Sequence, residues 1–431
     1  MVRTSRCRGR GECRPPLTCT PPVRRCACQT VPVRPLAAAS ALAALVLVTG
    51  CSGVTTATID RADKPPTTTA KPSGAKSPAP PASTTTTTTT IVDATPSDQR
   101  TLTKTKVITD GPLTPKSIEA SSGGLFFAQN MIYSHTVTVY DRTFAKVKVI
   151  PDTVTLADWG YDGHAGESKG GPVEMAFSHD GTKAYVSNYQ MYGAGFDNPG
   201  DDKCSKGDWD NSYVYRIDTK SLAIDQVIEV GPVPKYVAVT PDDATVLASN
   251  WCGYDLSVID AKTGKQTKRI DIGRFPRGIA VTPDSKTAFV AVMGTQNIAV
   301  VNLAEGTVEW INGVGQGPRH LVLDPTGAFL YATLNGEGKV AKIDVAARAV
   351  VAKVASPSQP RSMTIAPDGR SLYVVNYASD AMSKIRTSDM TQIQRVSTGH
   401  HPIGITYDRT DHRVWVACYS GSLYVFDDAA P

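Results

Sequence analysis

The chain has 431 residues and a formal net charge of +5. Residues 1–50 carry eight arginines against one acidic residue, a net of +7, so the rest of the chain sums to 5 − 7 = −2. This near-neutral remainder argues against nucleic-acid binding driven by bulk positive charge, because the basic character belongs to the leader.

Residues 1–30 hold five of the nine cysteines, at spacings that match no tetrahedral zinc pattern. We therefore predict no metal site there and expect translation to begin later, near Val31 or Val33. The five cysteines are Cys7, Cys13, Cys19, Cys26 and Cys28.

An apolar run, residues 36–48, follows Arg34. It is too short to cross a membrane, which takes about 20 residues, but it suits the apolar part of a signal peptide. The run leads into Val-Thr-Gly-Cys at Cys51, which resembles a bacterial lipobox and implies cleavage before that cysteine and its acylation. An ordinary signal peptide that ends beside a cysteine is the alternative. The lipobox interpretation predicts an exported protein anchored by lipid on the extracytoplasmic face of the cell membrane.

Residues 51–100 are rich in threonine and proline, with consecutive threonines at 84–90. They lack the apolar residues that would offset the entropy of ordering, so we predict a disordered tether. The sequence thus divides into a leader and signal peptide (1–50), a tether (51–100) and a folded domain (101–431).

The folded domain repeats a segment that begins with proline, and its last five copies are 42 residues apart. A fixed period of this size, built from short strands and turns, predicts a β-propeller blade. In the copy at Pro276 we expect strands at 278–282, 288–292 and 298–302, followed by a fourth. The seven copies begin at Pro115, Pro172, Pro234, Pro276, Pro318, Pro360 and Pro402.

The last copy stops before its fourth strand, whereas residues 103–110, just before the first copy, have the character of a strand. An N-terminal strand in that place would close the ring and remove both open edges. We therefore predict an all-β, seven-bladed propeller of four-stranded antiparallel blades, closed by its N-terminal strand.

The repeat carries VTPD at 239–242, AYVSN at 184–188 and LSVID at 256–260. This pattern resembles the YVTN-repeat (YncE-like) family of seven-bladed β-propellers. The resemblance implies the fold but leaves the function open, because related propellers include surface-layer proteins, lactonases and heavy subunits of quinone-type amine dehydrogenases.

Two steps of the repeat are longer than 42 residues, by 15 and by 20. The extra residues fall at 158–170, after the fourth strand of blade one, and at 190–212, between the second and third strands of blade two. Both loops should emerge on the same face of a propeller. Long loops on one face of a rigid scaffold are where function concentrates.

The residue after the repeat proline is a cation in five copies, and it should lie where the inner strand enters the axis. Inward-pointing cations would form a ring suited to an anionic ligand, whereas outward-pointing ones would only aid solubility. We assign His320 and His401 to the same mouth, and Tyr189 and Trp251 either to a groove beside it or to packing between blades. The five cations are Lys116, Lys235, Arg277, Arg319 and Arg361.

Cys204 lies in the second long loop and Cys252 in a neighbouring loop, so we predict a disulfide that pins the insertion. Cys418 should be buried and inert. The acidic residues of the second insertion miss the calcium-loop pattern, so we predict a solvated loop with no metal and no cofactor. These are Asp197, Asp201, Asp202, Asp208 and Asp210.

The sequence thus favours a non-catalytic binding module in the cell envelope, whose partner is an envelope protein, a glycan or an anionic small molecule. A lactonase-like hydrolase that uses His164, Glu174, His320 or His401 is the first alternative. Nucleic-acid binding is the second, and the charge of the domain counts against it.

Overall fold

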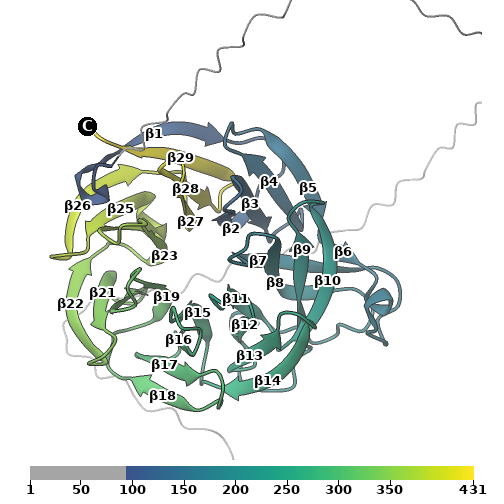
Figure 1. The fold of residues 1–431 in the computed structure, drawn as a ribbon. Helices are drawn as coiled ribbons and strands as arrows, with labels where there is room; N and C mark the ends of the chain where they lie inside the picture. The colour runs from purple at the N-terminus through teal and green to yellow at the C-terminus, as the bar shows by residue number, and fades with distance from the viewer. Residues whose placement is uncertain (1–93) are drawn as a thin grey trace, which may run out of the picture. The chain divides into compact units, whose positions relative to one another are not determined.

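The computed structural model describes residues 94–431, which form seven antiparallel sheets arranged as blades around one axis (Figure 1). Cys51, the signal peptide and nearly all of the tether lie outside the described residues. Besides strands, the described part contains three short 3₁₀ helices, η1 (Ser97–Gln99), η2 (Leu156–Trp159) and η3 (Tyr377–Ser379). None of its helices has the length and apolarity needed to span a membrane.

The strands of the first three blades run outward from the axis in chain order, except for a short extra strand in blade two. Blade one consists of β2 (Pro115–Ala120), β3 (Leu125–Asn130), β4 (Thr136–Asp141) and β5 (Lys146–Pro151). Blade two consists of β6 (Thr153–Val154), β7 (Ser168–Phe177), β8 (Lys183–Tyr192), β9 (Ser212–Asp218) and β10 (Ala223–Val230). Blade three consists of β11 (Pro234–Val239), β12 (Thr245–Asn250), β13 (Asp255–Asp260) and β14 (Lys265–Asp271).

The next three blades keep the regular four-stranded pattern. Blade four consists of β15 (Pro276–Val281), β16 (Thr287–Val292), β17 (Asn297–Asn302) and β18 (Val308–Ile311). Blade five consists of β19 (Pro318–Leu323), β20 (Phe329–Leu334), β21 (Lys339–Asp344) and β22 (Ala349–Ala355). Blade six consists of β23 (Pro360–Ile365), β24 (Ser371–Asn376), β25 (Ala381–Arg386) and β26 (Thr391–Ser397).

Blade seven joins the two ends of the domain, as the sequence predicted. It contains β27 (Pro402–Asp408), β28 (Arg413–Cys418), β29 (Ser422–Ala429) and, outermost, β1 (Thr101–Ile108). Strand β1 pairs antiparallel with β29, from Thr101 opposite Ala429 to Ile108 opposite Leu423, and Figure 1 shows the two ends of the colour scale side by side. The predicted closure is confirmed. Strand β1 covers the edge of β29 that would otherwise be left unpaired.

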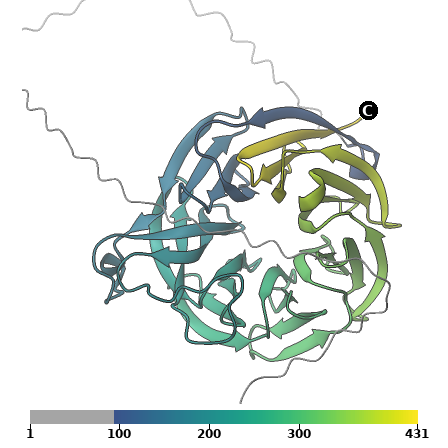
Figure 2. The same cartoon turned by 180° about the vertical axis from the view of Figure 1, so that it is seen from behind.

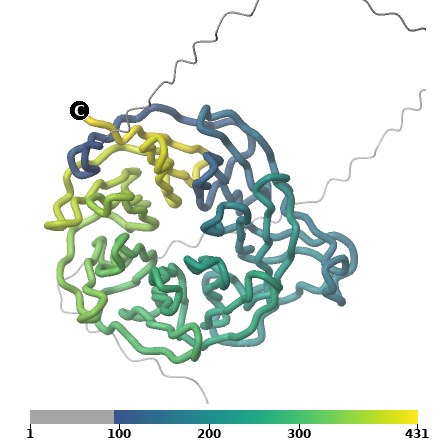
Figure 3. The backbone as a smooth tube through the Cα atoms, viewed as in Figure 1, coloured from purple at the N-terminus to yellow at the C-terminus, as the bar shows by residue number. Residues whose placement is uncertain are grey.

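The hydrophobic core lies between blades rather than within one central cluster. Seven clusters of buried side chains each join two neighbouring blades, so every blade-to-blade contact around the ring has its own core. Phe126 stacked on Trp415 at 4.0 Å, for example, joins blade one to blade seven. Figure 3 follows the chain through this ring. The arrangement makes the axis, where the inner strands face one another, the natural place for a site.

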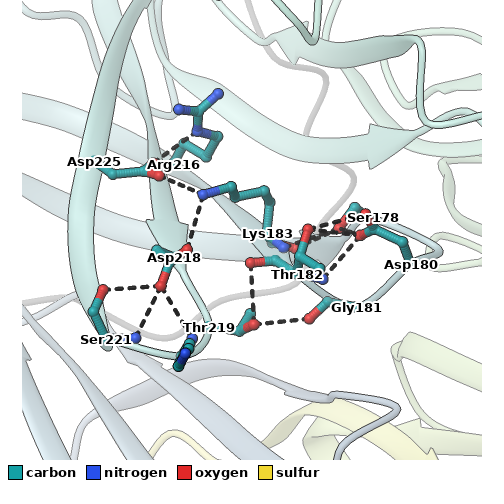
Figure 4. Close-up of polar contacts among 11 residues, drawn as sticks. Ser178, Asp180, Gly181, Thr182, Lys183, Arg216, Asp218, Thr219, Ser221 and Asp225 are labelled. Carbon is teal, nitrogen blue, oxygen red and sulfur yellow. Dashed lines mark hydrogen bonds and ion pairs between the residues drawn. The ribbon is translucent and has the colours of Figure 1, made fainter.

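Turns and hairpins at one face, here called the lower face, carry local polar networks. In blade two, Lys183 Nζ bridges Asp218 (2.9 Å) and Asp225 (2.6 Å), and Arg216 Nε contacts Asp225 at 2.7 Å (Figure 4). Asp180 accepts hydrogen bonds from the Thr182 amide and hydroxyl, both at 2.9 Å. Such contacts fix the turn geometry locally and contribute little net stability because the groups are partly exposed.

Blade two differs from the predicted four-stranded pattern. The first insertion places β6 against an N-terminal extension of β7, with Thr153 opposite Lys169 and Val154 opposite Ser168. The chain around β6 projects beyond the ring beside β10 (Figures 1 and 2). Six of the seven inner strands also begin at the repeat proline itself, which for the Pro276 copy is two residues before the expected start. Proline is tolerated there because the innermost strand has no partner on its axial side.

Candidate functional site

The five repeat cations all occupy an irregularity in the inner strand. In every blade the pairing of the inner strand with its neighbour shifts just after the proline, for example between Pro115 and Ser117 and between Pro276 and Ile279. The same shift follows the other five prolines. Such irregularities re-aim a side chain relative to a regular strand. Each cation is the residue directly after a repeat proline, and together they make the cationic ring: Lys116, Lys235, Arg277, Arg319 and Arg361.

The ring cations are buried around the axis rather than fanned into solvent. Lys116 is 7% exposed and Lys235, Arg277 and Arg319 are each 4% exposed, while Arg361 is partly buried. Blades two and seven place apolar residues at the same position, Val173 and Ile403. Of the two predicted arrangements, the inward one is present.

Mutual repulsion and burial act on the protonation of the ring. Burial, followed by the charge of Arg277, lowers the pKa of Lys116 well below its usual value. Burial and Arg277 likewise lower the pKa of Lys235 to about 7. Burial is also the main cause of the lowered pKa of Arg319, with Arg277 and Arg361 adding to it. The carboxylate Glu174 lies among these cations, 4.0 Å from the guanidinium of Arg277. The ring is therefore a buried cluster with more positive than negative groups.

The second insertion covers one side of the ring. Its Asp202 carboxylate contacts Lys235 Nζ and accepts a hydrogen bond from the Tyr189 hydroxyl at 3.0 Å. Burial alone would raise the pKa of Asp202, but Lys235 and the hydrogen bonds outweigh it and lower the pKa to about 2. The sequence predicts this aspartate only as one of several solvated acids. Nothing in the loop's composition singles it out, because its partner lies 33 residues away in the chain.

The predicted disulfide is present and holds this insertion in place. Cys204 and Cys252 are joined, with Cα atoms 5.7 Å apart. The Trp251 indole donates a hydrogen bond to the Asp202 carbonyl (3.3 Å), and the Tyr254 hydroxyl donates one to the Cys204 carbonyl (3.4 Å). Cys418 is free and buried, as predicted. The disulfide therefore fixes the backbone two residues from Asp202.

Aromatic rings flank the ring cations on two sides. Lys235 Nζ lies 4.4 Å from the centre of the Tyr189 ring and 4.8 Å from that of Trp251, which is itself 8% exposed and stacked on Phe275. Trp251 thus both packs and faces the site.

On the other side, Arg361 lies 4.1 Å from the centre of the Tyr377 ring, which stacks on His401 at 4.2 Å. His401 stacks in turn on His400, whose Nδ1 contacts Asp380 at 2.9 Å. His401 is therefore linked to the ring cation Arg361 through the stacked ring of Tyr377.

Below the ring, the inner strands enclose an axial cavity of about 700 Å³. It extends from Glu174 and His320 to the lower-face turns at Pro241 and Thr410. Among the proposed hydrolase residues, Glu174 and His320 line this cavity. His164 instead lies in the first insertion, stacked on Phe196 at 4.2 Å. The four residues assigned to hydrolysis are thus not gathered at one place.

The cavity wall contains polar groups that sequence reasoning missed. His320 Nδ1 accepts a hydrogen bond from the Met363 amide (3.4 Å), so its Nε2 carries the proton and donates to the Tyr236 hydroxyl at 3.0 Å. Burial, with Arg319, lowers the pKa of His320 to about 3, so the imidazole is neutral. Burial raises the pKa of Glu119 to about 8. Sequence analysis did not identify Tyr236, two residues after Pro234, or Glu119, four residues after Pro115. Their fixed distance from a repeat proline is the sequence signal that could have placed them on an inner strand.

The described residues contain no group of three or more histidine, cysteine or acidic side chains arranged to hold a metal ion. What they do form is a seven-bladed propeller with a buried cationic ring at the end of the axis where its two longest loops emerge.

The chain is similar to known propellers in sequence and in fold. Residues 211–382 match the family model described as YNCE-like β-propeller, which confirms the predicted resemblance over that stretch. The blades on either side continue the same pattern. The solved structure titled "Kuenenia stuttgartiensis Hydrazine Synthase" superposes with a TM-score of 0.59 at 19% identity, over 75% of this chain and 98% of that chain. At that identity the likeness establishes the fold alone. A search of curated proteins gave no match.

Proposed function

We propose that this protein is a lipid-anchored, extracytoplasmic binding module that takes an anionic ligand or partner at the cationic ring. A YNCE-like β-propeller is a scaffold suited to binding and interaction. The observation that carries the proposal is the convergence of five cations, from five different blades, on one buried end of the axis. Buried charge without equal countercharge costs folding free energy, so its presence at a loop-covered mouth favours a binding role.

Two further features support the proposed extracytoplasmic compartment. The lipobox-like sequence at Cys51 supports export and anchoring, and the disulfide between Cys204 and Cys252 is typical of an oxidising compartment. An envelope protein, a glycan or an anionic small molecule is therefore the partner class. Anchoring is tested by palmitate labelling of the expressed full chain, which Cys51→Ser should abolish together with membrane association. Labelling that persists in this variant would contradict the anchor.

Ligand binding is tested by thermal shift of the purified full chain with inorganic phosphate, polygalacturonate and a neutral dextran. A ligand at 100 times its Kd stabilises the folded state by about 2.7 kcal/mol, which is readily seen as a rise in Tm. We expect the anionic probes to raise Tm and the dextran to leave it unchanged. The double variant Arg277→Ala, Arg319→Ala should lose the shift.

The matched control is Arg348→Ala, which removes an exposed arginine paired with Glu309 on the outer surface. This variant should keep the full response to anions. If the ring variant responds to anions as strongly as wild type, the ring is not the binding site.

A further inference from the structure

We propose that the cationic ring binds a phosphate group carrying two negative charges, in the place where the Asp202 carboxylate now lies. This inference rests on the proposed function and deepens it, because it names the ligand class and assigns Asp202 as an internal competitor for the site. Three observations lead to it.

The first observation is the charge balance. Five basic side chains form the ring, and two carboxylates, Glu174 and Asp202, contact them. The formal excess is 5 − 2 = 3 positive charges when both lysines are protonated, and burial favours their neutral forms while no ligand is bound. A monoanion leaves most of the fully protonated excess in place, whereas a phosphate monoester brings close to two charges and three strong acceptor oxygens at neutral pH. Arginine guanidinium groups, of which the ring has three, match such oxygens geometrically.

The second observation is an unmet hydrogen-bonding demand. Within residues 94–431, Lys116 Nζ is buried and has no hydrogen-bond partner, and the same holds for Arg361 Nε. These two residues belong to blades one and six, which blade seven separates, so the unpaired donors come from two different blades of the ring. A buried donor without an acceptor costs about 1–3 kcal/mol, more when charged. A ligand with several acceptor oxygens would supply the hydrogen-bond acceptors that these two donors lack.

The third observation is that the chain already holds one anion over the ring. Asp202 contacts Lys235 directly and acts electrostatically on Arg277, Arg319 and Arg361 as well. Its side chain is 70% exposed, whereas that of Lys235 is 5% exposed, so the carboxylate lies at the solvent side of the ring. An incoming anion meets Asp202 first and gains most once this carboxylate has moved aside.

The site should also take up protons when a dianion binds. Because burial and Arg277 hold the pKa of Lys235 near 7, most of the Lys235 population is neutral at pH 8. A dianion beside Lys235 favours its charged form, as it does for Lys116, which also faces Arg277, Arg319 and Glu174. Binding at pH 8 should therefore take up protons from solution and weaken as the pH rises.

The test is isothermal titration of the full chain at constant ionic strength with inorganic phosphate, glycerol 3-phosphate, sulfate and acetate. Titrations in two buffers of different ionisation enthalpy report the protons taken up. We expect phosphate and sulfate to bind more tightly than acetate, with proton uptake at pH 8. Tighter binding of glycerol 3-phosphate than of phosphate would identify an ester as the natural ligand, and the reverse order would identify the free ion.

Variants separate this inference from the proposed function. Asp202→Asn removes the competing negative charge from the ring. It should therefore tighten phosphate binding about tenfold, which corresponds to about 1.4 kcal/mol. Asp208→Asn, in the same insertion and without a ring contact, should leave binding unchanged. Lys116→Met should weaken it.

If Asp202→Asn binds phosphate no better than wild type, or if acetate binds as tightly as phosphate, the present inference is wrong while anion binding stands. If neither wild type nor any variant binds any of the four anions, both the present inference and the proposed function are wrong.

Discussion

Two clusters of buried charge in this molecule are built in opposite ways. Lys384 and Asp428, both fully buried, lie 2.5 Å apart, and Lys384 Nζ also donates to the Arg100 carbonyl at 2.8 Å. The Tyr373 hydroxyl donates to the other Asp428 oxygen at 2.5 Å. Within the part of the chain that the structure describes, the cationic ring instead has more basic side chains than carboxylates and a lysine, Lys116, whose Nζ has no hydrogen-bond acceptor. A matched cluster fastens blade six to the closing blade, whereas an unmatched one is suited to receive a ligand.

The largest expected effect lies in the matched cluster. Asp428→Asn leaves Lys384 as a buried charge without a counterion, and we expect a loss of about 3–5 kcal/mol in the free energy of unfolding. Urea denaturation followed by circular dichroism measures it. The paired change Lys384→Met with Asp428→Leu should recover most of that loss. A loss below about 1 kcal/mol for the single variant would show that this pair is not what fastens the closure.

The disulfide comes next, because it holds the loop that carries Asp202. Replacing Cys204 and Cys252 by serine should reduce stability by about 2–4 kcal/mol, as expected for a closed loop with a sequence separation of 48 residues. Thermal denaturation with and without reductant measures the change. Reductant should destabilise wild type and have no effect on the double serine variant. Equal sensitivity of the two proteins would place the redox effect elsewhere.

The unmatched cluster should respond in the opposite direction to the matched one. Lys116→Met removes an unpartnered buried cation, so the unliganded protein should gain about 1 kcal/mol of stability. Lys220→Met, at an exposed lower-face hairpin, should change stability by less than about 0.5 kcal/mol. A clear loss of stability in Lys116→Met would mean that the ring is balanced after all.

The last expected effect is a pH dependence of stability. The pKa of Lys235 is about 7 in the folded state, because of burial and Arg277, against about 10.4 in the unfolded chain. Between these values the unfolded chain binds a proton that the folded state has released, so this residue makes stability rise with pH from about 7 to about 10. Below pH 7 both states hold the proton and the contribution is constant.

Lys235→Met should lack this rise. The difference in unfolding free energy between wild type and variant, measured from pH 7 to pH 10, isolates it from other titrating groups. A difference that does not change over this range would contradict the lowered pKa.

Sequence alone determined the number of blades, the strand that closes the ring, the disulfide and the face that carries the insertions. These follow from local signals: a 42-residue period, turn residues at fixed offsets, and cysteines in loops that the repeat places side by side. The five ring cations could also be identified from the sequence, because the repeat places the residue after each proline at the same level along the propeller axis.

Tertiary structure decided what those positions mean. The inward direction of Lys116 and the other four ring cations depends on an irregular pairing at the start of each inner strand. The amino-acid composition does not predict this irregularity. The partners that give each charge its character come from other blades or insertions: Asp202 for Lys235, Tyr236 for His320, and Asp428 for Lys384. Burial and the balance of charge are properties of the assembled ring, and for that reason the site could be located from the sequence but its electrostatics could not.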